Sequence, residues 1–193
     1  MTRKTASEIF ASKFLIFNNL VLSDVDIIDL SPPQMIDQIT AGTIDAAVTF
    51  EPYPFNIEKK LGSNAISWSA QGVEDTYLVL ISTDEFIKNH PQIIERYVRS
   101  LAQAEEYLKD HEAEARNILA KAVNYDDSYI AYFWPKITFY FALEQQFLLV
   151  LEDEARWAIM NKLTDKTVVP NYFDYIYKDA LEAVNPGAVT IVR

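Results

Sequence analysis

The sequence predicts an α/β protein in which a small, mostly parallel sheet is followed by a helical C-terminal part. Residues 25–30 and 44–50 are short and β-branched, and the stretch between them, opened by Pro32, has helical periodicity. A strand, a helix and a strand within about 26 residues is the spacing of a right-handed parallel crossover. Three of the four glycines fall within the first 72 residues, and the remainder has the pattern of amphipathic helices. We therefore expect two parts, residues 1–76 and 77–193.

Each element has a local signal in the chain. Residues 5–19 place apolar side chains at helical spacing behind Thr5 and Ser7, two residue types that cap helices. Pro32 suits the first turn of the next helix, and Gly42 suits its C-terminal cap. The other expected elements are strands at 76–83 and 188–193, and helices at about residues 89–108, 111–123, 127–145, 150–163 and 172–184.

The acidic composition argues against nucleic-acid binding. Lys and Arg total 17 against 28 Asp and Glu, so the formal net charge is −11 and the pI is near 4.6. Such a surface repels phosphate backbones and anionic lipids, and the densest basic cluster is only Arg3 and Lys4. No stretch approaches the roughly 18 to 20 apolar residues of a membrane span. Glu8 interrupts the apolar stretch that follows the basic start, so we expect no export signal or signal peptide.

The chain lacks the usual sequence marks of catalysis. It contains no cysteine, which excludes disulfides, thiolate nucleophiles, iron–sulfur clusters and cysteine-based zinc sites. No GxSxG, HExxH, Walker or GxGxxG pattern occurs. His90, His111 and the acidic pair Asp126–Asp127 stand at expected helix starts, where structural roles suffice. We therefore expect no catalytic residue, no metal and no cofactor. A helical stripe with a core role is expected at Ile130, Phe133, Trp134, Ile137 and Phe141.

One place in the sequence suits a small-molecule site. In parallel α/β sheets, ligands bind beyond the carboxyl ends of strands, where helix N-termini present free N–H groups. Phe50, Glu51 and Tyr53 lie at the carboxyl end of the second expected strand. Thr5 and Ser7 head the first helix, where two hydroxyls would cradle an anionic head group. These five residues are the candidate ligand-binding set.

Three segments carry a pattern that goes beyond periodicity. SPPQMIDQITAGTIDAAVTFEPYP, beginning at Ser31, is followed by ISTDEFIKNHPQIIERYVRSLAQAEEYLKDHEAEA and preceded by TRKTASEIFASKFLIFNNL. In this order and spacing they resemble the solute-binding proteins of ABC transporters for nitrate, sulfonates, taurine and thiamine-precursor pyrimidines. The residues that match are Ser31, Pro32, Gly42, Ile44, Asp45, Ala46, Glu51, Pro52 and Tyr53.

The resemblance implies an architecture like that of type 2 periplasmic binding proteins. Residues 1–76 would be part of the ligand-binding lobe, and residues 77–193 the hinge strand and helices of the other lobe, with the strands of the N-terminal lobe missing. It also implies an extracytoplasmic location and an ABC permease as the membrane partner. The solute would be small and anionic, zwitterionic or heteroaromatic, for example a sulfonate, taurine, nitrate or a pyrimidine.

Within that resemblance, Thr5 and Ser7 would donate hydrogen bonds to the solute, Phe50 would pack against it, and Glu51 would make a polar contact. A carboxylate at the site favours a zwitterion or a ring nitrogen over a bare anion. One alternative is an enzyme like those that make the thiamine pyrimidine, although that chemistry is associated with a cysteine-rich motif. The other is an oligomeric interaction domain. Helices after residue 84 would lack a sheet to cover, so we expect a homo-oligomer.

Overall fold

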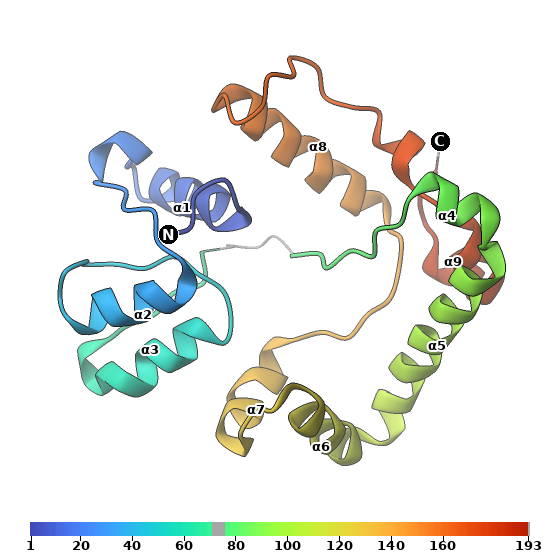
Figure 1. Ribbon diagram of the computed structural model, residues 1–193, viewed down its shortest axis with the longest axis horizontal. Coiled ribbons are helices and arrows are strands. Elements are labelled where there is room, and N and C mark those ends of the chain that lie inside the picture. The colour runs from blue at the N-terminus through green and yellow to red at the C-terminus, as the bar shows by residue number, and fades with distance from the viewer. Residues whose placement is uncertain (71–75, 193) are drawn as a thin grey trace. The chain divides into compact units, whose positions relative to one another are not determined.

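The computed structural model describes residues 1–70 and 76–192, and the elements in these ranges are helices joined by turns and extended segments (Figure 1). The chain divides into two compact units, Met1–Tyr77 and Leu78–Arg193. No β-strand occurs in the described ranges, so the expected α/β fold with a parallel sheet is wrong. Each unit is instead built by helix packing.

The first unit contains α1 (Ala6–Phe17), α2 (Pro32–Thr40) and α3 (Tyr53–Leu61). Helix α2 begins at a proline, and Ser31 donates its backbone N–H to the Gln34 side chain at 2.9 Å, which closes a capping box. Helix α2 packs side by side with α3 (Figure 1), and each contributes a buried apolar side chain, Met35 and Ile57. Gly42, with φ +70°, follows α2 in the left-handed region that glycine tolerates.

The segments expected to be strands run without a ladder. Residues 25–30 make two backbone hydrogen bonds to Met1, from its N to Ile28 O and from Leu30 N to its O, both 3.2 Å. These two bonds have the pattern of a parallel strand pair, but the pairing does not extend beyond Met1. A parallel strand needs neighbours and a cover on both faces. Residues 44–50 and 76–83 have no strand assignment, and Leu78 in the latter is 94% exposed.

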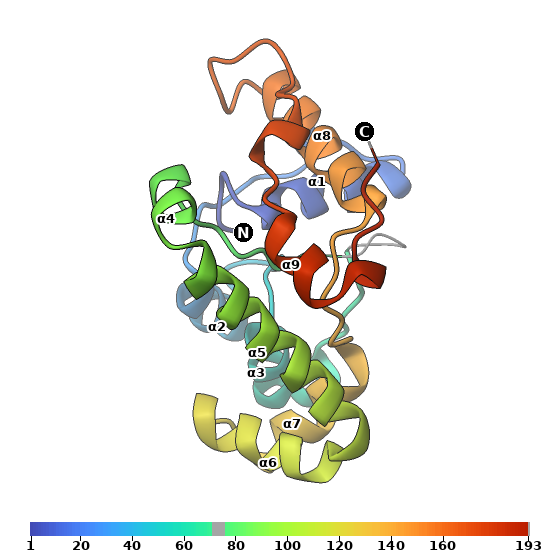
Figure 2. The same ribbon diagram turned by 90° about the vertical axis from the view of Figure 1, so that its right-hand side faces the viewer.

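The second unit holds six helices within its described residues: α4 (Asp84–Asn89), α5 (Pro91–Asp110), α6 (Glu112–Val123), α7 (Asp127–Phe133), α8 (Gln145–Met160) and α9 (Asp179–Val184). Helices α5 and α9 pack together around the main buried cluster, which consists of Val98, Ala180, Leu181 and Ala188 (Figure 2). Of the strand expected at 188–193, residues 188–192 are described, and they form one parallel bridge, between Leu143 and Val189; Arg193 lies outside the described residues.

The aromatic region is divided rather than carried by one helix. The helix expected over residues 127–145 ends at Phe133 and passes into a 3₁₀ turn, Trp134–Lys136, because Pro135 has no N–H to continue the helical bonding. Tyr129 and Ile130 are buried on α7, whereas Phe141 packs against the α5–α9 cluster. The expected single stripe is therefore wrong, although its members still serve packing.

In the portion of the chain that the structure describes, no helix combines the length and the apolar character that crossing a bilayer requires.

Candidate functional site

Three of the five candidate residues meet in the corner where the chain enters α3. The Phe50 ring lies edge-on to the Tyr53 ring, with centroids 5.4 Å apart and planes at 89°. The Tyr53 N–H donates to Phe50 O at 3.1 Å, and the intervening Glu51–Pro52 peptide bond is cis. Phe50 is 60% exposed. The corner therefore presents an aromatic face to solvent with a carboxylate one residue away; we call residues 49–53 the α3 corner.

Thr49 adds a polar atom that sequence reasoning missed. Its Oγ1 is buried and makes no hydrogen bond within the described structure. A buried hydroxyl without a partner is uncommon in native proteins and calls for an explanation. Its position beside Phe50, at the end of the segment expected to be a strand, was the signal that would have included it. In the structure it belongs to the same corner as the three candidates.

Thr5 and Ser7 belong to a different element, the first turn of α1. Thr5 is exposed, and its Oγ1 donates to Thr2 O at 2.8 Å. Ser7 is buried. The Glu8 carboxylate, only 2% exposed, accepts hydrogen bonds from Lys4 N at 2.6 Å and from Arg3 Nε at 3.2 Å. The helix start that would attract an anion thus already has a carboxylate beside it.

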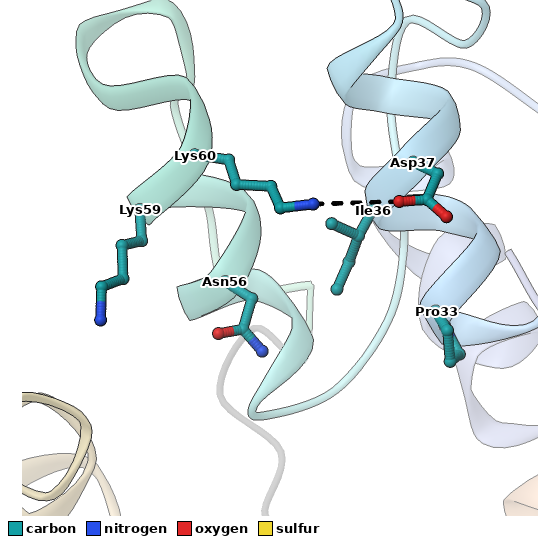
Figure 3. Close-up of a pocket in the computed structure, with 6 residues that line it drawn as sticks. All are labelled: Pro33, Ile36, Asp37, Asn56, Lys59 and Lys60. Atoms are coloured by element: carbon teal, nitrogen blue, oxygen red, sulfur yellow. Dashed lines mark ion pairs between the residues drawn. The ribbon is translucent and has the colours of Figure 1, made fainter. Parts of the chain in front are cut away.

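A groove lies on the same unit between α2 and α3 (Figure 3). It has a volume of about 400 Å³ and is lined by Pro33, Ile36, Asp37, Asn56, Lys59 and Lys60. Lys60 Nζ reaches across it to Asp37 Oδ1 at 3.8 Å, and both side chains are at least half exposed. Exposed ion pairs of this kind contribute little, about 0 to 1 kcal/mol. None of the five candidate residues lines this groove.

Three titratable groups that the sequence singles out stand at helix starts in the structure. The Asp126 carboxylate accepts the Tyr129 N–H at 2.7 Å and so caps α7. His90 and His111 occupy the N-cap positions of α5 and α6. Within residues 1–70 and 76–192, no group of three or more His, Asp or Glu side chains is placed to hold a metal ion. The five candidate residues therefore fall into two groups, one at the α3 corner and one at the start of α1.

Comparison with protein families places the chain among the solute-binding proteins of ABC transporters, of the nitrate-, sulfonate- and taurine-binding type, which are typically extracytoplasmic. A model of the NMT1-like family matches residues 11–124, more than half of the chain, and the protein belongs to that family. The matched span includes the α3 corner as well as α5 and α6. Neither the curated proteins nor the solved structures contain a significant match to this chain.

Proposed function

We propose that the protein is the solute-binding component of an ABC importer and that the α3 corner contacts the solute. The observation that carries this proposal is the juxtaposition of an exposed Phe50 ring, packed edge-on against Tyr53, with the Glu51 carboxylate and the unpartnered Thr49 hydroxyl. Small-molecule sites combine an apolar surface with a few fixed polar groups, and the corner supplies both. The family assignment supports the same reading.

The charge at the corner narrows the class of solute. A bare anion placed 4 Å from the Glu51 carboxylate would be repelled by about 4 kcal/mol at the effective dielectric constant of a protein surface. A zwitterion brings an ammonium group that reverses the sign of this interaction, and a pyrimidine brings N–H donors that a carboxylate accepts. The Phe50 ring would then pack against the alkyl or ring portion. We therefore favour an amino-sulfonate such as taurine, or a pyrimidine, over nitrate.

Thr5 and Ser7 keep the role that the resemblance implies, which is hydrogen bonding to the anionic end of the solute. The exposed Thr5 hydroxyl donates to Thr2 O and would have to turn its proton from that carbonyl toward the solute, whereas Ser7 is buried in its own unit and would need a change of exposure. Replacing each with alanine separates the two contributions. A loss of affinity with Thr5→Ala alone would restrict the role to Thr5.

The proposal also includes binding without chemical conversion, an extracytoplasmic location and an ABC permease as partner. The chain has no cysteine, so the cysteine-rich motif associated with pyrimidine-forming relatives is absent from it. Mass spectrometry of a retained solute checks this part directly. An unchanged solute mass after prolonged incubation supports a binding protein, and a new product mass would favour the enzymatic alternative.

The test of the site is titration calorimetry with taurine, an unsubstituted alkanesulfonate, nitrate and a pyrimidine. Phe50→Ala should weaken binding of the preferred solute at least tenfold, because it removes the packing surface. Phe17→Ala makes the same change at another exposed phenylalanine, on α1, and should leave affinity unchanged. Glu51→Gln should weaken binding of taurine more than that of the plain sulfonate. Binding that is insensitive to both corner variants would refute this assignment, and so would failure to bind any member of the panel.

A further inference from the structure

Helix α5 carries a second apolar stripe that its own unit leaves exposed. The face toward α9 contains Ile94 and Val98. The neighbouring face of α5 carries exposed residues spaced 4, 3, 4 and 3 positions apart in the sequence. We call it the α5 stripe, and it consists of Ile93, Tyr97, Ser100, Ala104 and Tyr107. The three large members are 44%, 53% and 37% exposed, in that order.

The shape of the stripe suits a second helix. Alternating spacings of 3 and 4 residues form the seam along which two helices pack knobs into holes. Ser100 and Ala104 are small and lie in the middle of the stripe, where two helices can approach closely, and the large side chains lie toward the ends. In an antiparallel pair, Ser100 would face Ala104 of the other helix and Tyr97 would face Tyr107. The four central layers of the seam would then be filled, and Ile93 would lie opposite the C-terminal end of the other α5, near its His111.

The charges beside the stripe indicate that the second helix is α5 of another copy of this chain. Arg96 and Arg99 flank its N-terminal half, whereas Glu106 and Asp110 flank its C-terminal half. Antiparallel pairing of two identical helices sets Arg96 near Asp110 and Arg99 near Glu106 in both directions, whereas parallel pairing sets like charges together. The intrahelical ion pairs that Arg99 and Glu106 make are exposed and therefore weak. With a net charge of −11, association without such complementarity would be repulsive.

We propose that two copies of this chain associate through their α5 stripes, antiparallel, as a weak homodimer. The stripe spans 14 residue steps, so it is about 21 Å long, and a helix is about 10 Å wide, which makes the footprint on each copy small. Stable interfaces bury roughly 1,200 to 2,000 Å² in total, and this one falls below that range. We therefore expect reversible association with a dissociation constant in the micromolar range or weaker. The proposal does not depend on which solute binds.

Sedimentation velocity over a concentration series tests the surface. The full chain should shift from monomer to dimer with increasing concentration. Tyr97→Glu should weaken association at least tenfold, whereas the matched control Ile118→Glu, at a residue 55% exposed on α6, should leave it unchanged. Circular dichroism establishes that both variants are folded. A parent chain that stays monomeric into the millimolar range, or equal behaviour of the two variants, would overturn the proposal.

Charge exchange tests the partner and its direction. The double variant R96E/R99E makes the whole flank acidic, and E106R/D110R makes it basic, so each alone should be monomeric. An equimolar mixture of the two should dimerise, because each supplies the charge that the other lacks. A mixture that stays monomeric would refute the electrostatic register. Association of either variant alone would do the same.

Cysteine trapping measures the register, and the chain suits it because it contains no native cysteine. A mixture of Ser100→Cys and Ala104→Cys chains should form disulfide-linked heterodimers faster than either chain forms homodimers. Faster homodimer formation would indicate parallel pairing and contradict the model of the dimer. Slow maleimide labelling of Ser100→Cys in a monomeric chain would show that another part of the same chain covers the stripe, which also overturns the proposal.

Discussion

Leu181 is the side chain whose truncation should reveal how much the α5–α9 packing stabilises the second unit. It lies in the main buried cluster, is 4% exposed, and has Val98, Ala180 and Ala188 as the other buried members. Leu→Ala changes in well-packed cores cost about 2.7 to 5.0 kcal/mol, more when the cavity cannot relax. Here the surrounding apolar side chains are only partly buried and can close on the space. We therefore expect a loss of about 2 to 3 kcal/mol.

Urea unfolding measures this loss. For a slope of about 2 kcal/mol per M, the midpoint should fall by about 1 to 1.5 M. Far-ultraviolet circular dichroism follows the helices, and the fluorescence of Trp134 and Trp157 reports on the second unit, with that of Trp68 reporting on the first. Leu149→Ala is the control, because Leu149 on α8 is 56% exposed and should cost less than about 0.5 kcal/mol. If Leu181→Ala and Leu149→Ala shift the urea midpoint equally, the buried α5–α9 cluster does not stabilise the second unit more than an exposed position does.

Two further predictions concern single side chains in the same unit. Asp126→Ala should lower the free energy of unfolding by about 1 kcal/mol, because the carboxylate that accepts the Tyr129 N–H caps α7. Asp126→Asn keeps an acceptor, so thermal unfolding should show only a few tenths of that loss. Equal losses for the two variants would count against a capping role. The pKa of Tyr107 is raised above its ordinary value because its hydroxyl donates to the Glu114 carboxylate, which favours the neutral phenol. Its contribution to stability should therefore be complete below about pH 10 and be lost as the pH rises through the raised pKa. In an alkaline spectrophotometric titration, Glu114→Gln should move this ionisation to lower pH, and an unchanged curve would disprove the interaction.

The helices with local signals were predicted well. The structure confirms α1, α2, α5 and α6 close to the expected ranges, because apolar spacing marks each body, and Thr5 or a proline marks the starts of α1, α2 and α5. Helix α3 was not expected, since Tyr53 was assigned only to a ligand site. The helix expected over 127–145 is too long, because Pro135 has no N–H to continue the helical hydrogen bonding beyond Phe133.

Part of the candidate site could be predicted from the amino-acid sequence alone. Phe50 and Tyr53 are only three residues apart, so a turn between them suffices to bring their rings together, and the structure shows the contact. The state of Thr49 depends on what covers its hydroxyl, which no spacing in the sequence reveals. The same holds at the start of α1, where Ser7 is buried while Thr5 two residues earlier is exposed.

Local sequence signals account for features that depend on neighbours within about one helical turn, such as the starts of α2 and α5 and the aromatic pair at the α3 corner. Helical hydrogen bonds join residues four apart, so propensity and capping suffice to place them. Only the tertiary structure decided whether residues 25–30, 44–50 and 76–83 found ladder partners, and it shows that they did not. It also decided which face of α5 meets α9 and which remains exposed. A strand and a buried face are both completed by residues far away in the chain, and local pattern alone cannot supply those partners.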